Sequence, residues 1–499
     1  MTDIESFGVI LNVIPSGQTA SLRPIMNVCP CTQGDPLRRS VILLGFLRVI
    51  SAFSLAISLT GCPESPSAPD RSIRKIILIS LDTLRTDHLG VYGYSRDTSP
   101  RIDEFARRAF VFERALASAP NTPPSQMSMM TSRYPGQHGF TGDGDTMAPS
   151  LETLAERLRK AGLQTAGFVD GGYLSSEFGF DRGFEIYDDE GGGLEEILPR
   201  ALAWLDANGD DPFFLFLHSY DIHAPYLSPP PYDGMFHDEP YAGDLIPTAE
   251  RMDEIFFAQQ TVEPEDMQHL VDSYDEGIRY ADAQIGRLLD HLRSSGRLED
   301  TLVVLTSDHG EEFGEHGSVL HWQLFFQPNL RVPLIIRPPR GIDGPFRVDD
   351  QAELIDVLPT LLALVGAEPL AEAQGRSLVE VASYGDWLDA TDSRDDYERA
   401  AFAWWPDPEM IPMRSIVLDG HQLLFNSRSI LGTQLFDLEA DPMSRENIVK
   451  EKPLLVARMY RLGIRAMQEN QPVEGATGNG GETLDPKIRD QLRALGYQR

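Results

Sequence analysis

The sequence contains four short segments in which every residue is apolar, and this pattern restricts the fold more than any other feature. They span residues 76–79, 213–217, 302–305 and 334–336. A strand buried on both faces needs such a run, as in a parallel sheet covered by helices. Between them, apolar residues recur at helical spacing in 151–158, which Ser150 is placed to cap, and in 274–293. Strands alternating with helices predict an α/β fold with a central, mostly parallel sheet flanked by helices.

The sequence changes character after about residue 385, and its 499 residues leave room for two unequal domains. Residues 74–384 hold the strand-and-helix pattern and are predicted to form the larger domain. Residues 385–470 read as short strands joined by turns, with a helix after them, which predicts a smaller α+β domain. Residues 471–499 read as a linker and a terminal helix. Residues 226–265 are rich in Pro, Tyr, Asp and Glu and are expected to form a long surface excursion, such as a lid.

The amino-terminal region resembles an export signal. A basic flank precedes an apolar run over 49–59, and residues 59–62 (LTGC) resemble the lipobox of bacterial lipoproteins. The run is shorter than the roughly 20 residues that span a bilayer, but it fits a signal peptide; a core helix is the alternative. We therefore predict a signal region over 1–62, a lipidated Cys62 as membrane anchor and a tether over 63–73. This predicts an exported lipoprotein of the bacterial cell envelope, facing the periplasm or on the cell surface.

The net charge limits the possible partners. Lysine and arginine number 43 and aspartate and glutamate 76, which gives a formal net charge of −33 at pH 7. A field of this sign repels nucleic acid and anionic membrane surfaces, so we expect neither as a binding surface. A small anionic substrate is compatible with it, because salt screens exposed charges over roughly 8 Å and a bound cation dominates its own cleft. No cysteine follows Cys62, so a disulfide or a thiolate metal site is excluded beyond that residue.

Three of the predicted strands end at residues that bind metals or transfer protons. These are Asp82 after the first strand, His218, Asp221 and His223 at the end of the second, and Asp308 and His309 after the third. The carboxyl ends of parallel strands meet at one edge of a sheet, so we expect these side chains to converge. Carboxylates combined with imidazoles suit calcium, magnesium, manganese or zinc.

Each residue of this set also fits an ordinary structural role. Asp82 fits a cap for a following helix, and Asp308 with Gly310 fits a turn. His223 fits simple packing against its neighbours. Thr122 stands before two prolines at the start of an apparent helix, where it either caps the helix or points at a substrate.

Several long stretches closely resemble the sulfatase family of the alkaline-phosphatase-like superfamily. They are LISLDTLRTDHLGVYGYSRDTSPRIDEFARRAFVFERALASAPNTPPSQMSMMTSRYPGQHG, FLHSYDIHAPY, TSDHGEEFGEHGSVLHW with LRVPLIIRPP, and QLFDLEADPMSREN, in collinear order over roughly residues 74–470. The resemblance implies a large alkaline-phosphatase/sulfatase-like α/β domain and a smaller carboxyl-terminal α+β domain. It also implies a divalent metal ion at the sheet edge. Calcium is first by the family, and manganese, magnesium or zinc are alternatives.

The resemblance also implies roles for single residues. It places the metal ligands at Asp82, Thr122, Asp308 and His309. It makes Thr122 the nucleophile as well. It puts His223 and His321 where relatives contact the transferred group, protonate the leaving oxygen or bind a second metal. That second site would consist of Asp221, His223 and His321.

The sequence departs from the family pattern around the nucleophile. Threonine at position 122 cannot be oxidised to the formylglycine of standard sulfatases, and Gln126 stands where they carry arginine. The stretch GFVDGGYLSS replaces a family segment that carries a lysine. The basic residues nearest to the predicted site are Arg85 and Arg133, which we expect either to bind substrate or to form structural salt bridges.

These features predict hydrolysis of sulfuric esters through a covalent Thr122 intermediate. A cation lowers the pKa of a bound hydroxyl as it does that of water, and backbone N–H groups of the helix beginning near Ser125 are expected to face the oxyanion. A threonine ester has to be attacked directly, which keeps phosphate mono- or diesters and phosphonates as alternative substrates. A phospho-group transferase and a sugar-binding relative without catalysis are further alternatives. The expected substrates are small anionic esters, or sulfated or phosphorylated glycans or lipids.

Overall fold

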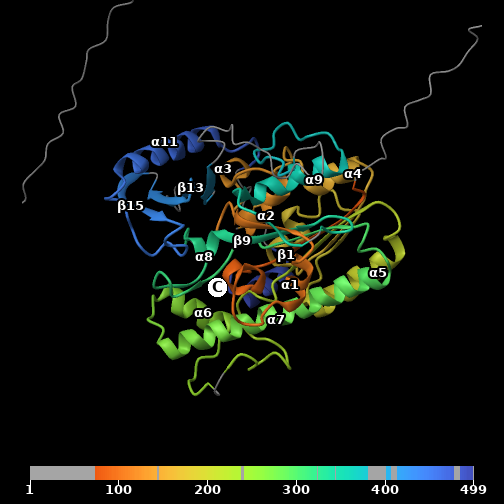
Figure 1. The fold of residues 1–499 in the computed structure, drawn as a ribbon, viewed down its shortest axis with the longest axis horizontal. Helices are drawn as coiled ribbons and strands as arrows, with labels where there is room; N and C mark the ends of the chain where they lie inside the picture. Colours follow the sequence, from red (N-terminus) through yellow and green to blue (C-terminus); the bar gives the residue numbers. More distant parts are fainter. Residues whose placement is uncertain are drawn as a thin grey trace, which may run out of the picture. The chain divides into compact units, whose positions relative to one another are not determined.

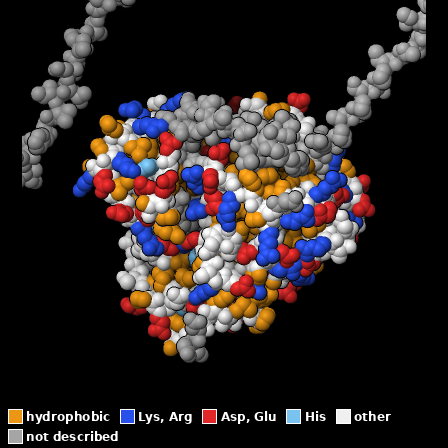
Figure 2. Space-filling model, viewed as in Figure 1, with side chains coloured by type: hydrophobic (Ala, Val, Ile, Leu, Met, Phe, Trp, Pro, Cys, Tyr) orange, Lys and Arg blue, Asp and Glu red, His pale blue; other side chains and the backbone are white. Residues whose placement is uncertain are grey.

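The computed structural model describes residues 73–142, 145–237, 241–322, 324–342, 344–379, 400–405, 413–426, 428–476 and 484–497. The predicted signal region, Cys62 and the tether up to residue 72 lie outside the described residues. Within the described part of the chain, no helix combines the length and the apolar character needed to cross a membrane. On the face shown in Figure 2, acidic and basic side chains are interspersed.

The described chain contains a nine-stranded sheet in the order β10-β2-β9-β6-β1-β5-β3-β4, with β11 paired to β2. The strands are β1 (Lys75–Leu81), β2 (Phe110–Leu116), β3 (Gln164–Phe168), β4 (Ile186–Asp188), β5 (Phe213–Ser219), β6 (Leu302–Thr306), β9 (Arg331–Arg337), β10 (Phe346–Val348) and β11 (Ala352–Glu353). β1 lies at the centre and pairs in parallel with β5 and β6. The predicted mostly parallel sheet is confirmed.

β9 runs antiparallel to both of its neighbours, β6 and β2. A parallel neighbour needs a crossover of a dozen or more residues, usually a helix. The described residues between β6 and β9 instead form the hairpin of β7 (Glu312–Phe313) and β8 (Val319–Leu320) and the short helix α8 (Gln327–Leu330). The chain therefore turns back at the edge where β6 ends, and this connection remains beside the carboxyl ends of the parallel strands.

Helices cover both faces of the sheet (Figure 1). One face packs against α1 (Pro100–Ala106), α5 (Gly193–Asn208) and α7 (Pro264–Ser294), and the other against α2 (Thr122–Thr131), α4 (Leu154–Lys160) and α9 (Val357–Val365). Successive residues of β1 alternate between the two cores: Ile76 and Leu78 face α2 and α9, whereas Ile77 and Ile79 face α5 and α7. This two-sided burial explains the uninterrupted apolar runs of the sequence.

The carboxyl-terminal region forms a second, antiparallel sheet in the order β12-β13-β14-β15 within the described residues. Its strands are β12 (Ala401–Trp404), β13 (Met413–Leu418), β14 (His421–Asn426) and β15 (Ser429–Asp437). Helix α11 (Pro453–Glu469) packs on it through Val456, Met459 and Ala466. The predicted small α+β domain is therefore present, and its predicted start near residue 385 lies outside the described residues.

Some helix boundaries differ from the predictions. α7 begins ten residues before the predicted start at 274, at Pro264. The cap of α4 is Thr153 rather than Ser150, because Thr153 and Glu156 form a reciprocal capping box. α2 begins at Thr122 rather than near Ser125. The remaining helices are α3 (Pro135–His138), α6 (Ala249–Phe257), α12 (Pro486–Ala494) and the 3₁₀ turns Thr86–His88, Gly90–Tyr92, Gly172–Leu174, Ser176–Phe178 and Leu354–Asp356.

Candidate active site

Three adjacent strands deliver acidic and imidazole side chains to one point. Asp82 follows β1, His218 is the last residue but one of β5, and Asp308 lies two residues beyond β6. The register pairs Ser80 with His218 and with Thr306, so the three strands end at the same level. One ligand atom from each of Asp82, His218 and Asp308 lies within 4.8 Å of the others, and all three side chains are fully buried.

Four polar atoms of this cluster have no hydrogen-bond partner among the described residues. They are Asp82 Oδ1, Asp308 Oδ2 and both ring nitrogens of His218. Burial, and then the nearby Asp308, raises the pKa of Asp82 well above its usual value. Buried, unpaired carboxylates are costly unless a cation compensates them. Two carboxylates and an imidazole also form a donor set suited to a divalent ion, so these residues fit the predicted metal.

His309 adds a further nitrogen to the cluster. Its Nδ1 donates a hydrogen bond to the carbonyl of Gly310 at 2.9 Å, which leaves Nε2 facing the carboxylates. Nε2 lies 3.8 Å from Asp82 Oδ1 and 3.7 Å from Asp308 Oδ2. Although burial acts in the opposite direction, Asp308 and Asp82 raise the pKa of His309. The negative charge that acts on His309 is therefore the same charge that a bound cation would neutralise.

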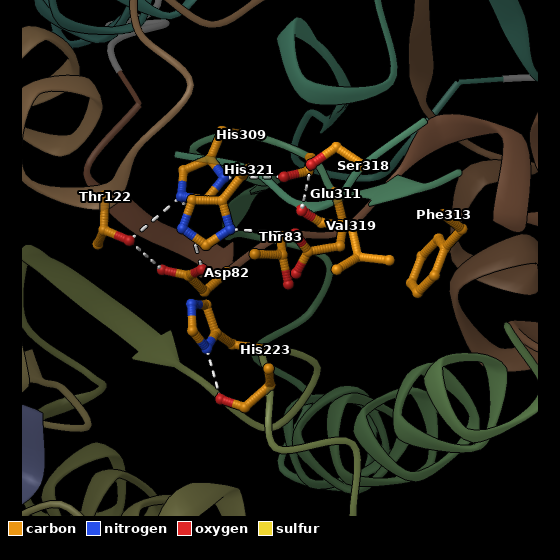
Figure 3. A network of polar contacts seen from close by, with 12 residues as sticks. Asp82, Thr83, Thr122, His223, His309, Glu311, Phe313, Ser318, Val319 and His321 are labelled. Carbon is orange, nitrogen blue, oxygen red and sulfur yellow. Dashed lines mark hydrogen bonds and ion pairs between the residues drawn. The ribbon is translucent and has the colours of Figure 1, made fainter. Parts of the chain in front are cut away.

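Thr122 lies directly beside this cluster (Figure 3). Its hydroxyl donates to Asp82 Oδ2 at 3.0 Å and lies 3.2 Å from His309 Nε2. Thr122 is the first residue of α2, and the Ser125 hydroxyl donates to the carbonyl of Asp308 at 2.6 Å, which ties the helix to the end of β6. The two prolines set the backbone direction at the helix start.

The helix start supplies fewer amide donors than predicted. Pro123 and Pro124 have no N–H, and the N–H of Ser125 is bonded to the carbonyl of Asn121 at 3.1 Å. Gln126, which stands where standard relatives carry arginine, donates from Nε2 to Ser80 Oγ at 2.9 Å. The first turn of α2 therefore aims the hydroxyl, and it does not form a ring of N–H groups around an anion.

His223 and His321 present their Nε2 atoms to the same site (Figure 3). His223 Nδ1 donates to the carbonyl of Ala224 at 2.6 Å, and His321 Nδ1 lies 3.1 Å from Glu311 Oε1. Glu311 also accepts a hydrogen bond from the Tyr226 hydroxyl at 2.9 Å. Burial lowers the pKa of His223 to about 3 and that of His321 well below its usual value. Both rings are thus neutral, and their Nε2 atoms are acceptors.

The structure does not bring the other predicted residues into this arrangement. Asp221 accepts hydrogen bonds from the Leu194 N–H at 2.7 Å and the Ser219 hydroxyl at 2.6 Å, so its carboxylate caps α5 and does not face His223 and His321. His223 and His321 each form a hydrogen bond through Nδ1, and the carboxylate of Asp221 contacts neither ring. The predicted second metal site therefore lacks its acidic ligand.

Neither predicted substrate-binding arginine is free for that role. Arg85 is buried and paired with Asp87 at 2.8 Å and Glu315 at 2.7 Å. Arg133 lies two residues beyond the end of α2, at the opposite end of that helix from Thr122, and donates to Gln137 Oε1 at 2.7 Å. Arg85 therefore forms the structural salt bridges predicted as the alternative, whereas Arg133 donates to a neutral amide. The site thus has no arginine clamp from these two positions.

The structure places at the site two residues to which the family resemblance had given no role. His218 was visible as a polar residue ending an apolar run, but a single buried histidine is equally common in a core. Tyr497 had no sequence signal; its hydroxyl lies 3.1 Å from Thr122 Oγ1 and 2.8 Å from His223 Nε2. It reaches the site from beyond α12, and only the fold reveals this.

The fold and the buried site at the carboxyl edge of its sheet match those of the alkaline-phosphatase-like superfamily, to which the sulfatase family belongs. The model of the sulfatase family matches residues 74–367, more than half of the chain, and the chain belongs to that family. Residues 314–462 match the carboxyl-terminal region of N-sulphoglucosamine sulphohydrolase. The chain is accordingly an ester hydrolase.

Relatives and solved structures agree with this placement. The N-acetylglucosamine-6-O-sulfatase of Bacteroides thetaiotaomicron is 23% identical over 486 residues, covering 79% of this chain and 85% of that protein. The phosphonate monoester hydrolase of Agrobacterium radiobacter superposes with a TM-score of 0.64 at 20% identity, covering 79% and 95% of the two chains. A protein solved with its substrate D-glucosamine-2-N,6-O-disulfate gives 0.63 at 21% identity, covering 80% and 99%. At these identities the structures support the fold alone.

Proposed function

We propose that this protein is a metal-dependent hydrolase of sulfuric esters that acts through a covalent ester on Thr122. The observation that carries the proposal is the convergence of Asp82 Oδ2 and His309 Nε2 on Thr122 Oγ1 at 3.0 and 3.2 Å. The unpaired oxygens of Asp82 and Asp308 beside it add support. A structural threonine at a helix start has no need of a buried carboxylate and an imidazole around its hydroxyl.

The ion would be held by Asp82, His218 and Asp308, whose donor atoms lie within 4.8 Å of one another, together with His309, whose Nε2 lies 3.8 and 3.7 Å from the two carboxylates. When bound, a divalent cation neutralises the carboxylates, lowers the pKa of a neighbouring hydroxyl and polarises an ester oxygen. The donor set of two carboxylates and two imidazoles suits manganese or zinc as well as calcium.

The residues divide the reaction into two halves. In the first, Thr122 Oγ1 attacks sulfur, the bond from sulfur to the ester oxygen breaks, and the alcohol leaves with the proton that Thr122 gives up. In the second, water attacks the sulfur of the Thr122 ester and its proton returns to Oγ1. His223 and His321 face this point with neutral Nε2 atoms, so they accept and pass on the protons of both halves.

Phosphonate monoesters and phosphodiesters are the second candidate substrates. Threonine cannot expel the product by elimination as hydrated formylglycine does, so water has to attack the intermediate at its tetrahedral centre, a reaction that phosphorus allows readily. The charge of the substrate also matters, because the site holds few basic side chains: Arg85 and Arg133 bond to other residues, and Gln126 is neutral. A single negative charge, as in sulfate esters, phosphonate monoesters and phosphodiesters, suits the site better than the double charge of a phosphate monoester.

The names of the relatives support a sugar as the alcohol part of the substrate. One relative is an N-acetylglucosamine-6-O-sulfatase, and a solved structure holds D-glucosamine-2-N,6-O-disulfate. We also propose that Cys62 anchors the protein in the bacterial envelope, which its LTGC sequence supports. A Cys62→Ser variant that is processed and lipidated normally would remove this part of the proposal.

A matched substrate panel tests the reaction. The purified protein, loaded in turn with calcium, manganese and zinc, is assayed with 4-nitrophenyl sulfate, 4-nitrophenyl phenylphosphonate, bis(4-nitrophenyl) phosphate and 4-nitrophenyl phosphate. We expect turnover of the monoanionic esters, led by the sulfate, and much slower turnover of the phosphate monoester. A phosphate monoester turned over fastest would contradict the charge argument, and phosphonate turnover without sulfate turnover would favour the second candidate.

A further inference from the structure

The hydroxyl of Tyr497 occupies the centre of the site. It lies 3.1 Å from Thr122 Oγ1, 2.8 Å from His223 Nε2 and 3.3 Å from His321 Nε2. A substrate poised for attack holds its reacting atom about 3–3.5 Å from the nucleophile. The phenol oxygen therefore lies where the tetrahedral group of an ester would have to lie, and the two cannot occupy the site together.

The hydrogen-bond directions show that Tyr497 is bound there as a neutral phenol. Because His223 Nδ1 donates to the Ala224 carbonyl, its Nε2 accepts the proton of the Tyr497 hydroxyl. The contact thus has the chemistry of an alcohol product held beside the nucleophile.

The local sequence around α12 aims this side chain. Asp485 caps the helix by accepting the Lys487 N–H at 2.7 Å, and Leu492 is completely buried. Gly496 has φ +85°, and the N–H of Tyr497 bonds back to the carbonyl of Leu492 at 2.9 Å. This is the glycine-terminated helix end in which the chain reverses direction. The reversal turns Tyr497 away from the helix axis and into the site.

Helix α12 packs closely against a turn that contains Gly171 and Gly172. Gln491 Oε1 accepts the N–H of Gly172 at 3.1 Å, and Gln491 Nε2 donates to the carbonyl of Glu190 at 3.4 Å. Gly171 has φ +70°, a conformation that favours glycine, and a Cβ atom there would lie 2.6 Å from Gln491 Oε1. The turn belongs to GFVDGGYLSS, the stretch that replaces the lysine-bearing segment of standard relatives.

The ring of Tyr497 fills a slot that is lined by aromatic side chains. It meets Tyr173 edge to face at 4.8 Å and Trp322 at 6.3 Å between ring centroids. The cavity beside it, bordered by His223, His321 and Trp322, measures about 10 Å³. That volume holds about one water molecule. An ester can therefore enter this slot only after Tyr497 has left it.

We propose that residues 484–497 gate the active site and that Tyr497, as an internal phenol, fills the subsite for the alcohol part of the substrate. The proposal rests on the function proposed above, since it takes Thr122 as the nucleophile. The slot released by Tyr497 takes a six-membered ring with apolar faces that carries the esterified oxygen at its edge. The substrate class is therefore an ester of a phenol or of a sugar ring that stacks on aromatic side chains.

Binding of p-cresol, which has the structure of the tyrosine side chain, tests the subsite without any need for turnover. Isothermal titration calorimetry of Tyr497→Ala should show p-cresol binding in the millimolar range. The unchanged protein should show none, because its own phenol fills the slot. Tyr460→Ala, which removes a half-buried tyrosine that packs on Phe425 in the carboxyl-terminal domain, is the matched control and should bind no p-cresol.

Kinetics with the 4-nitrophenyl ester that the protein hydrolyses separates a gate from a catalytic role. If the closed state competes with substrate, it reduces the apparent affinity for substrate by a fixed factor. Tyr497→Ala and deletion of residues 484–499 should then lower KM by that factor and leave kcat nearly unchanged. Tyr497→Phe, which loses only the hydroxyl contacts, should lower KM less. Tyr460→Ala should behave like the unchanged protein.

Two results would overturn the gate: Tyr497→Ala that binds no more p-cresol than the unchanged protein, or Tyr497→Phe with reduced kcat at constant KM, which would make the hydroxyl catalytic. The proposed function can fail separately. Binding of p-cresol to Tyr497→Ala without any ester at Thr122 would keep the subsite and remove the nucleophile.

Discussion

The hydroxyl of Thr122 donates a hydrogen bond to Asp82 Oδ2 at 3.0 Å, although the two residues are 40 positions apart in the chain. Asp82 follows the central strand β1, and Thr122 is the first residue of the helix that follows β2, which β9 and β6 separate from β1 in the sheet. This hydrogen bond therefore joins the carboxyl end of the central strand to the start of helix α2. The second oxygen of Asp82 has no partner among the described residues, which leaves it available to the proposed cation.

His218 is expected to be a metal ligand, because neither of its buried ring nitrogens has a hydrogen-bond partner among the described residues and Nε2 lies 3.6 Å from Asp82 Oδ2. His218→Asn should weaken metal binding by at least about tenfold, since even residues that only support ligands have effects of this size. Competition with a fluorescent chelator measures the dissociation constant. His291→Asn, which changes a surface histidine paired with Asp206, is the control. Equal affinities in the two variants would remove His218 from the site.

Metal removal should lower the thermal unfolding midpoint, because Asp82 and Asp308 then face each other without compensation. An ion at about 100 times its dissociation constant adds about 2.7 kcal/mol of stability. Differential scanning calorimetry with and without chelator measures the change. Asp308→Asn should lose this response. It should be no less stable than the metal-free parent, since it removes one of two like charges that repel each other. A chelator response that Asp308→Asn retains would place the ion elsewhere.

Glu311 is expected to position His321, because its carboxylate holds Nδ1 of that ring at 3.1 Å and leaves Nε2 facing the reacting group. Glu311→Gln should lower kcat about 10- to 100-fold with little change in KM. The next residue, Glu312, offers a matched control: it is equally buried but pairs with His316 at 2.8 Å. If Glu312→Gln lowered kcat as much as Glu311→Gln, the effect would be structural.

Asp282 makes a pH-dependent contribution to stability. It accepts the N–H groups of Arg101 and Ile102 at the start of α1, and burial raises its pKa to about 7. Because this pKa is raised above the unfolded value, the contribution is full below about pH 4 and is lost as the pH rises through about 7. Asp282→Asn keeps an acceptor and removes the titration.

Thermal unfolding at about pH 5 and about pH 8 checks this prediction. The parent should lose more stability than Asp282→Asn between the two values, by at most about 3 kcal/mol. A stability difference between parent and variant that stays constant with pH would contradict the assignment.

Much of the fold and part of the site could be predicted from the sequence, for identifiable physical reasons. The uninterrupted apolar runs of β1, β5 and β6 reflect burial on both faces, so their ends, and with them Asp82, Asp308 and His309, could be located. The family resemblance added Thr122. Local capping was less predictable, because Thr153 and Ser150 are both good caps and only the reciprocal bond with Glu156 selects Thr153.

The parts that could not be predicted depend on contacts between distant segments. Arg85 is neutralised by Glu315, 230 residues away, so its sequence neighbourhood alone could not show that it is unavailable to a substrate. Asp221 caps a helix that begins 28 residues earlier in the chain. Tyr497 reaches Thr122 across 375 positions, through the packing of α12 against a glycine turn. None of these relationships leaves a periodic or local signal.

The central claim is that Thr122 forms a covalent bond with the transferred group, and mass spectrometry of the Thr122 peptide tests it directly. The metal-loaded protein is mixed with excess 4-nitrophenyl ester, quenched with acid within the turnover time and digested. The account predicts one added sulfuryl or phosphoryl group, localised by fragmentation to Thr122 and absent from the same peptide of protein treated without substrate. Full turnover by Thr122→Ala, or an adduct located on another residue, would contradict the account.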